Sequence, residues 1–334
     1  MTVLAISSQV VAGHVGNSAA QPVLQMLGHE VWALPTVLLS HHPGHGAPMR
    51  RATPAADLRA MAASLEDGGW LSGLTAVSTG YFTDPDQVDA AASILTGIRH
   101  RHPDITILVD PIMGDQGSLY VAEDVAHAVA RDLAPMATIL TPNLFELSHL
   151  TGREDVRQLA DIDAIEAAAR SLGTAEVIVT STPAAQASHI GTIAVTADGR
   201  HVTENLHVEN APNGVGDVAA ASYLGHRLNG QSVQQSLEAA ITMVAALIAE
   251  AQRNLLYVKT FSGYIAEQGS GSVVKVTSDS STAQANPDAM FARTLSKIYT
   301  RVLGVISRPE STSWKDPVLE VQEIGQGIAD LGLY

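Results

Sequence analysis

Cysteine is absent from the 334 residues, so the chain has no disulfide framework, no thiolate metal site and no cysteine nucleophile. Aromatic residues make up only 4%, which predicts a core built from Ala, Val, Leu and Ile. No apolar run reaches the ~18 residues that a membrane span needs, and residues 1–11 predict a strand rather than a signal peptide. We therefore expect a soluble, cytoplasmic protein with no membrane partner.

Lysine is missing from residues 1–258 and occurs only at Lys259, Lys275, Lys297 and Lys315. The first 258 residues hold 12 Arg against 26 acidic residues, whereas residues 259–334 hold 7 basic and 8 acidic residues. A shift this sharp, next to a Ser- and Thr-rich stretch, predicts a boundary. We place one domain at residues 1–253 and a divergent C-terminal extension of unknown role at residues 254–334.

The overall composition indicates a folded, acidic protein. Hydrophobic residues make up 46% and charged residues 16%, which is typical of globular chains, and the length is sufficient for a substantial core. The formal net charge is −15 at pH 7, which argues against non-specific binding to nucleic acid.

Short apolar strands alternate with helical stretches along residues 1–253. Strands are predicted near residues 3–7, 30–39, 76–79, 105–109, 138–140 and 177–179, followed by a hairpin around Asp198 and Gly199. This alternation predicts an α/β fold, a three-layer α/β/α sandwich with a mostly parallel central sheet. Polar residues follow several of these strands, and parallel strands bind ligands at their carboxyl ends. We expect one site formed by Ser8, Tyr81, Asp110, Asn143 and Thr180.

The segment 213–217, Asn-Gly-Val-Gly-Asp, stands directly before an Ala-rich helix. Glycines let the backbone approach a ligand closely, and the free N–H groups of a helix start favour an anion. Asp217 in the same turn suits a base that removes a proton from an attacking hydroxyl group while the N–H groups stabilise a transferred phosphoryl group. The same turn also occurs with Asp as a helix cap, so the motif alone leaves both roles open.

Two further acidic motifs follow predicted strands. Residues 110–115 are Asp-Pro-Ile-Met-Gly-Asp, and residues 141–146 are Thr-Pro-Asn-Leu-Phe-Glu. Oxygen ligands of this kind suit Mg²⁺ with bound phosphates, which would offset nucleotide charge in a chain without lysine before position 259. Strand-end capping is the alternative explanation for each motif taken alone.

Together these motifs resemble the pyridoxal kinase family of the ribokinase-like superfamily. The matching segments occur in family order over roughly residues 1–253, and the most specific is Gly-His-Val-Gly-Asn-Ser at 13–18. The resemblance implies a ribokinase-like sandwich, usually a homodimer, that phosphorylates the 5′-hydroxyl of pyridoxal, pyridoxine or pyridoxamine with ATP. It also implies Mg²⁺ with the ATP and a monovalent cation such as K⁺.

The resemblance further implies a role for individual residues. Asp217 would be the catalytic base, with an anion hole formed by Gly214, Val215 and Gly216. The vitamer would contact Ser8, Val37, Pro43, Gly44, Tyr81 and Asp217. ATP would contact Asp110, Thr141, Asn143, Glu146, Thr180 and Ser181, and the metal would lie near Asp115 and Glu146.

Some residues depart from the family pattern. Pro43 stands where the family commonly has Thr, and His45 where it has an aromatic Tyr, so one contact to the vitamer is lost. Beyond residue 253 no family feature is recognised. A hydroxymethylpyrimidine kinase, or a vitamer- or nucleotide-binding protein with weak catalysis, therefore stays open beside an active pyridoxal kinase.

Overall fold

The computed structural model describes residues 1–267 except 116, 154–155, 157–160 and 210, with only the helical backbone described for residues 252–267. These residues belong to one compact unit, Met1–Lys297. A second unit, Ile298–Tyr334, and most of the predicted extension lie outside the described residues.

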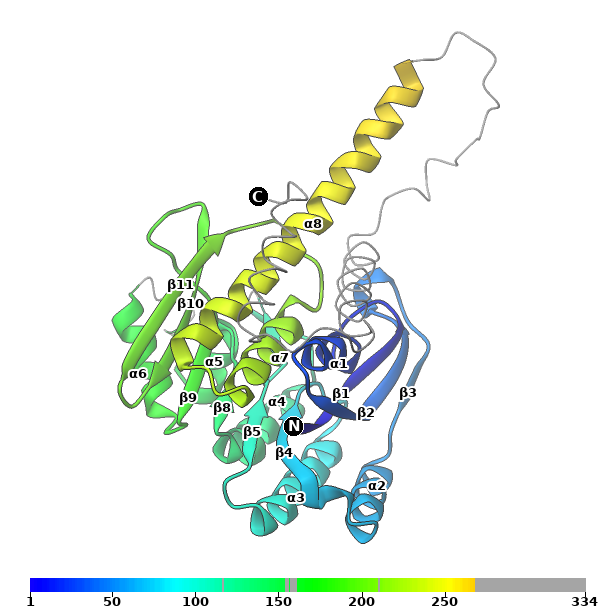
Figure 1. The fold of residues 1–334 in the computed structure, drawn as a ribbon, viewed down its shortest axis with the longest axis vertical. Helices are drawn as coiled ribbons and strands as arrows, with labels where there is room; N and C mark the ends of the chain where they lie inside the picture. The colour runs from blue at the N-terminus through cyan, green and yellow to red at the C-terminus, as the bar shows by residue number, and fades with distance from the viewer. Residues whose placement is uncertain (116, 154–155, 157–160, 210, 268–334) are drawn as a thin grey trace, which may run out of the picture. The chain divides into compact units, whose positions relative to one another are not determined.

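A nine-stranded sheet forms the centre of this unit, in the order β11-β10-β9-β8-β5-β4-β1-β2-β3 (Figure 1). The six strands from β9 to β2 in that order are parallel to one another, and antiparallel strands flank them on both sides. A separate pair, β6 and β7, is antiparallel. The strands are β1 Thr2–Ala12, β2 Glu30–His41, β3 Arg50–Ala52, β4 Leu74–Thr79, β5 Thr106–Val109, β6 Gly114–Asp115, β7 Ser118–Leu119, β8 Ile139–Leu140, β9 Glu176–Thr182, β10 His189–Thr196 and β11 Gly199–Leu206.

Helices cover both faces of the sheet, which confirms the predicted three-layer α/β/α sandwich. Helices α1, α7 and α8 pack together on one face, and α2 to α6 lie on the other (Figure 1). The helices are α1 Asn17–Met26, α2 Ala55–Asp67, α3 Pro85–Arg101, α4 Glu123–Ala128, α5 Leu144–Thr151, α6 Ile162–Ser171, α7 Val215–Leu228 and α8 Val233–Glu267. A π-helical turn, Val129–Leu133, extends α4.

Local sequence explains both the core and the helix ends. The central strand β5 is buried on both faces, as its uninterrupted apolar run Ile107-Leu108-Val109 requires. Helix α3 begins where the side chain of Asp84 accepts a hydrogen bond from the N–H of Gln87, with Pro85 in its first turn. Aliphatic side chains dominate the core, as the low aromatic content predicted.

Two element boundaries differ from the sequence prediction. Strand β1 ends at Ala12, close to the end of the strand expected over residues 1–11 but beyond the apolar run 3–7, because a register shift between Ser7 and Gln9 lets it keep pairing with β2. Ser8 therefore lies within the strand rather than after it. Helix α7 begins at Val215 instead of Asp217. Helix α8 runs through the predicted domain boundary at residue 253, which stays a prediction. None of the described helices is long and apolar enough to cross a membrane.

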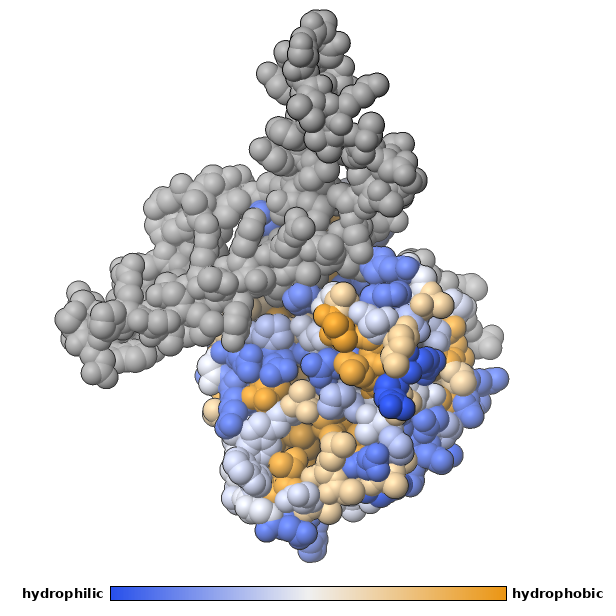
Figure 2. Space-filling model, turned by 90° about the vertical axis from the view of Figure 1, so that its right-hand side faces the viewer, coloured by the Kyte–Doolittle hydropathy of each residue, from blue (hydrophilic) through white to orange (hydrophobic). Residues whose placement is uncertain are grey.

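The side of the molecule next to β3 carries apolar patches between hydrophilic ones (Figure 2). Large apolar side chains of the neighbouring segments are exposed there, including Val11 of β1, Leu38 of β2 and Met49 before β3. Val10 and Leu39, which precede Val11 and follow Leu38 in the sequence, point to the opposite face of the sheet and are buried. The end of this three-strand region therefore has one face towards the interior and one apolar face towards solvent.

Candidate active site

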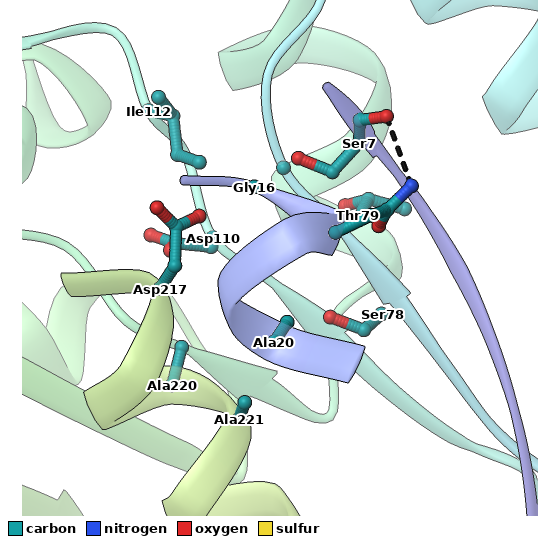
Figure 3. Close-up of a pocket in the computed structure, with 12 residues that line it drawn as sticks. Ser7, Gly16, Ala20, Ser78, Thr79, Asp110, Ile112, Asp217, Ala220 and Ala221 are labelled. Atoms are coloured by element: carbon teal, nitrogen blue, oxygen red, sulfur yellow. Dashed lines mark hydrogen bonds between the residues drawn. The ribbon is translucent and has the colours of Figure 1, made fainter. Parts of the chain in front are cut away.

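A small cavity opens at the carboxyl ends of the central strands, where β1, β4 and β5 meet the start of α7 (Figure 3). Two of the predicted site residues, Asp110 and Asp217, lie in its wall. Except for Ile112, the remaining lining residues are small or polar; the full set is Ser7, Gly16, Asn17, Ala20, Ser78, Thr79, Gly80, Ile112, Ala220 and Ala221. The parallel topology places the carboxyl ends of these strands at one edge of the sheet, but of the five residues expected to form one site only Asp110 lines this cavity.

The turn before α1 and the turn before α7 fit closely against each other. Gly214 has φ +92°, and a Cβ placed on it would lie 2.0 Å from the carbonyl oxygen of His14. Gly16 has φ +55°, and its Cβ would lie 2.3 Å from both the carbonyl oxygen and the Oγ of Ser8. Glycine is required at both positions by conformation and by space. This contact fixes the start of α7 against the end of the β1 segment.

Asp217 stands in the first turn of α7 with its carboxylate directed into the cavity (Figure 3). Burial raises the pKa of Asp217 to about 6, although hydrogen bonds from the N–H groups of Gly16 and of Asp217 itself oppose the rise. A carboxylate with a pKa near the working pH is a suitable proton acceptor. The first hydrogen bond within α7 runs from the Val218 N–H to the Gly214 carbonyl. The N–H groups of residues 215–217 therefore have no carbonyl partner within the helix.

Asp217 has three acidic residues near it that the sequence analysis also singled out: Asp110, Glu146 and Asp115. Burial and then the charges of Glu146 and Asp217 raise the pKa of Asp110 well above its usual value. Burial also raises the pKa of Glu146 to about 7, with Asp115 adding to the rise. Such mutual repulsion identifies a place that favours positive charge.

Tyr120 belongs to the same cluster and was missed by the sequence analysis. Although the residue is 56% exposed as a whole, desolvation of its phenol oxygen and then the negative charges of Glu146, Asp110, Asp217 and Asp115 raise the pKa of that group. It follows β7, and its N–H donates to the carbonyl of Met113 at 3.0 Å. No sequence signal pairs Tyr120 with the acidic residues, since only the hairpin β6–β7 brings it to them.

Asn143 and Glu146 form a reciprocal cap at the start of α5. The Asn143 Oδ1 accepts from the Glu146 N–H at 2.9 Å, and the Glu146 Oε2 accepts from the Asn143 N–H at 3.0 Å. The same two side chains reach the 110–115 segment, because Met113 N–H donates to Glu146 Oε1 at 2.8 Å and Asn143 Nδ2 donates to the Gly114 carbonyl at 2.9 Å. The motif therefore caps α5, and the same two side chains also contact the acidic segment 110–115.

The remaining residues predicted for ATP lie on neighbouring strand ends. Thr141 follows β8 and is buried beside Asp110. The N–H of Thr180 in β9 donates to the Pro142 carbonyl at 2.9 Å, which joins that strand to the same edge. Ser181 follows with φ +58°, a left-handed conformation that turns the chain within β9. These residues form a continuous rim from Asp110 to β9.

The residues predicted for the vitamer lie on the other side of the cavity. Val37 is fully buried and packs with Val10, Leu39, Val15 and Tyr81. Tyr81 is held through its backbone, because its N–H donates to Ser7 Oγ at 3.1 Å and its carbonyl accepts from the Thr36 hydroxyl at 2.7 Å. Ser8 is buried behind Gly16, and its neighbour Ser7 lines the cavity instead.

Pro43 and Gly44 form an exposed helical turn, Pro43–His45, after β2. The side chain of His42 caps this turn by accepting from the Gly44 N–H at 3.1 Å. A Cβ on Gly44 would lie 3.5 Å from Asn213 Nδ2, directly before the glycine turn of α7. The Pro43–His45 turn therefore lies beside the segment that precedes α7.

Two buried polar atoms of the cavity wall have no hydrogen-bond partner among the described residues, Asn17 Oδ1 and Thr79 Oγ1. The Asn17 side chain is fixed by its Nδ2, which donates to the Ser7 carbonyl at 3.1 Å. Buried polar groups without partners are costly, so such atoms mark places for a ligand or water. The sequence analysis did not assign Asn17 to the site, although Asn17 belongs to the motif 13–18 and stands at the start of a helix.

No group of three or more His, Cys, Asp or Glu side chains is arranged to hold a metal ion within the described part of the chain. Asp115 is exposed at the end of β6, and three backbone N–H groups already face the Glu146 carboxylate. The raised pKa values of Asp110 and Glu146 nevertheless fit a cation that arrives together with an anionic ligand.

Known proteins resemble this chain over most of its length. The family model described as phosphomethylpyrimidine kinase matches residues 60–259. A pyridoxine/pyridoxal/pyridoxamine kinase from Bordetella avium is 37% identical over 255 residues, covering 74% of this chain and 84% of that protein. A pyridoxal kinase from Corynebacterium diphtheriae is 35% identical over 251 residues, covering 74% and 88%. The structure of Leishmania donovani pyridoxal kinase in complex with ADP and pyridoxamine is 30% identical, with a TM-score of 0.68 and coverage of 74% and 89%.

Proposed function

This chain belongs to the pyridoxal kinase family, and we propose from this membership that its cavity is where a B6 vitamer accepts a phosphoryl group. The protein is an ATP-dependent kinase that phosphorylates the 5′-hydroxyl of pyridoxal, with pyridoxine and pyridoxamine as further substrates. The roles that we assign to individual residues rest on one observation: the carboxylate of Asp217 points into the cavity from the start of α7 and has a pKa of about 6.

Asp217 acts as the general base in this proposal. Its carboxylate accepts the proton of the 5′-hydroxyl as that oxygen attacks the γ-phosphorus of ATP, and the bond from the γ-phosphorus to the bridging oxygen of ADP breaks. The backbone N–H groups of Gly214, Val215 and Gly216 stand at the helix start that favours anionic charge, so they stabilise the transferred group. Gly16 keeps the Asp217 carboxylate in place through its N–H.

Asp110, Thr141, Asn143, Glu146, Thr180 and Ser181 form the nucleotide side of the cavity. They lie on the rim from β5 to β9, opposite the vitamer side formed by Ser8, Val37, Pro43, Gly44 and Tyr81. A divalent cation, which we propose to be Mg²⁺, would neutralise phosphate charge there, held near Asp115 and Glu146. A positive charge there would oppose both burial and the mutual repulsion, which together raise the pKa values of Asp110 and Glu146.

The assembly and the location of the protein are further parts of the proposal. We propose a homodimer in the cytoplasm, where ATP is the common phosphoryl donor, and the exposed apolar face of Val11, Leu38 and Met49 agrees with a covered surface. Sedimentation at several concentrations tests the dimer. Activity measured with and without K⁺ tests the proposed monovalent cation.

The direct test is ADP formation from Mg-ATP with pyridoxal, run beside hydroxymethylpyrimidine and a blank without acceptor. We expect pyridoxal-dependent ADP release. A higher kcat/KM with hydroxymethylpyrimidine would favour the second candidate, which the description of the matching family model motivates. Vitamer binding without ADP release, from a protein shown to be folded, would contradict both kinase functions.

A further inference from the structure

Ile112 has a backbone conformation that β-branched residues rarely adopt. Its φ is +41°, and it is one of two non-glycine residues with positive φ in the described part of the chain. The side chain of a β-branched residue collides with its own backbone in this region, so the conformation persists only where the surroundings impose it.

Hydrogen bonds hold the chain on both sides of Ile112. Before it, the Asp110 N–H donates to the Thr79 carbonyl at 2.9 Å, and Pro111 has a fixed φ. After it, the Met113 N–H donates to Glu146 Oε1 at 2.8 Å, and the Met113 carbonyl accepts from the Tyr120 N–H at 3.0 Å. Because the backbone is fixed on both sides, the chain turns between these hydrogen bonds through the φ angle of Ile112.

The strained conformation directs the Ile112 side chain into the cavity (Figure 3). Among the described residues that line the cavity, Ile112 has the only apolar side chain larger than alanine. Its Cδ1 lies 3.0 Å from the point where a Cβ on Gly80 would stand, so the missing side chain of Gly80 makes room for it. The cavity therefore has one apolar wall, beside the carboxylates of Asp110 and Asp217.

We propose that Ile112 is a positioning residue, whose side chain packs against the acceptor's hydroxymethyl carbon and thereby places the hydroxyl group on Asp217. This rests on the proposed function, because it assumes that an alcohol is phosphorylated in this cavity. An apolar wall favours the carbon and disfavours the oxygen, so the hydroxyl group turns towards the carboxylate. Misplacement of a reacting group by about 1 Å lowers a rate by up to about 10²-fold.

The test compares Ile112→Val, Ile112→Ala and Ile112→Gly with the full-length wild-type protein. We expect the Ala and Gly variants to lose about tenfold or more in kcat, while KM for pyridoxal and for ATP changes by less than about threefold, because the wall orients the acceptor rather than binding it. Ile112→Val keeps the branched wall and should stay within about threefold of the wild-type kcat.

Thermal unfolding of the same variants tests the strain separately. Glycine normally lowers stability relative to alanine, but at positive φ the order reverses, so Ile112→Gly should melt about 2 °C or more above Ile112→Ala. The matched control is Ile190 in β10, also half-buried but without positive φ, where the Gly variant should melt below the Ala variant and both should keep full activity.

Failure of the inference and failure of the function are distinguishable. An active wild type whose Ile112→Ala and Ile112→Gly variants keep kcat within twofold overturns the positioning role. The same stability order at residues 112 and 190 overturns the strain. A wild type without pyridoxal-dependent ADP formation overturns the proposed function, and the positioning role with it.

Discussion

Replacing Asp217 by Asn should make the protein more stable and far less active. Asn has nearly the same shape and can still accept a hydrogen bond from the Gly16 N–H through its carbonyl oxygen. It cannot accept the proton of the attacking hydroxyl group. General-base catalysis contributes about 10²–10⁴-fold, so kcat should fall by that factor, while ATP binding stays largely intact.

The gain in stability follows from the sign of the pKa shift. The pKa of Asp217 rises from 3.8 to about 6 in the folded protein, so the fold binds this proton more tightly than the unfolded chain does. The charged carboxylate therefore destabilises the fold fully above about pH 6, and the penalty disappears as the pH falls towards 3.8. The shift corresponds to about 3 kcal/mol at most, and to roughly 1–2 kcal/mol after screening in an open cavity. A gain of that size raises Tm by about 4 °C.

Two measurements test this reasoning. Thermal unfolding should show Asp217→Asn well above the wild type at about pH 8, with the difference reduced to about half at pH 5 and nearly gone at about pH 4. The wild-type kcat/KM should fall below about pH 6, where Asp217 becomes protonated. Asp198→Asn, in the exposed turn between β10 and β11, is the matched control and should change neither quantity. An acid limb near pH 4, or an Asp217→Asn variant with wild-type turnover, would refute the role of Asp217 as base.

Three other perturbations have defined outcomes. Gly214→Ala places a Cβ against the His14 carbonyl at positive φ, so kcat should fall by more than about tenfold, measured by ADP release. Tyr223→Phe removes the 2.7 Å hydrogen bond to Glu176 and should lower the free energy of unfolding by about 1–2 kcal/mol in urea titrations. Burial lowers the pKa of His29 below 6.5, so its contribution to stability is full above that pH and is lost as the pH falls below it. His29→Gln should therefore flatten the dependence of Tm on pH between about pH 7.5 and pH 5.5, and an unchanged slope would contradict this.

Much of the fold was predictable because it depends on local pattern. The short aliphatic runs before Asp110, Thr141 and Thr180 predict buried parallel strands, and the parallel topology places their carboxyl ends at one edge. The glycines around Val215 predict a tight turn before a helix. The placement of Ser8 after the first strand was wrong, because a register shift that depends on pairing with β2 extends β1 beyond Ser8.

The sequence by itself determined which chemical groups stand at strand and helix ends, since apolar periodicity and turn residues act over a few positions. Only the tertiary structure decided what those groups experience. The pKa of Asp217 depends on burial and on Gly16, which lies some two hundred residues away in the chain. Tyr120 joins the acidic cluster, and Ile112 takes a strained conformation, through contacts with other segments. Desolvation, strain and charge repulsion arise from packing between distant segments, and no local pattern of residues records that packing.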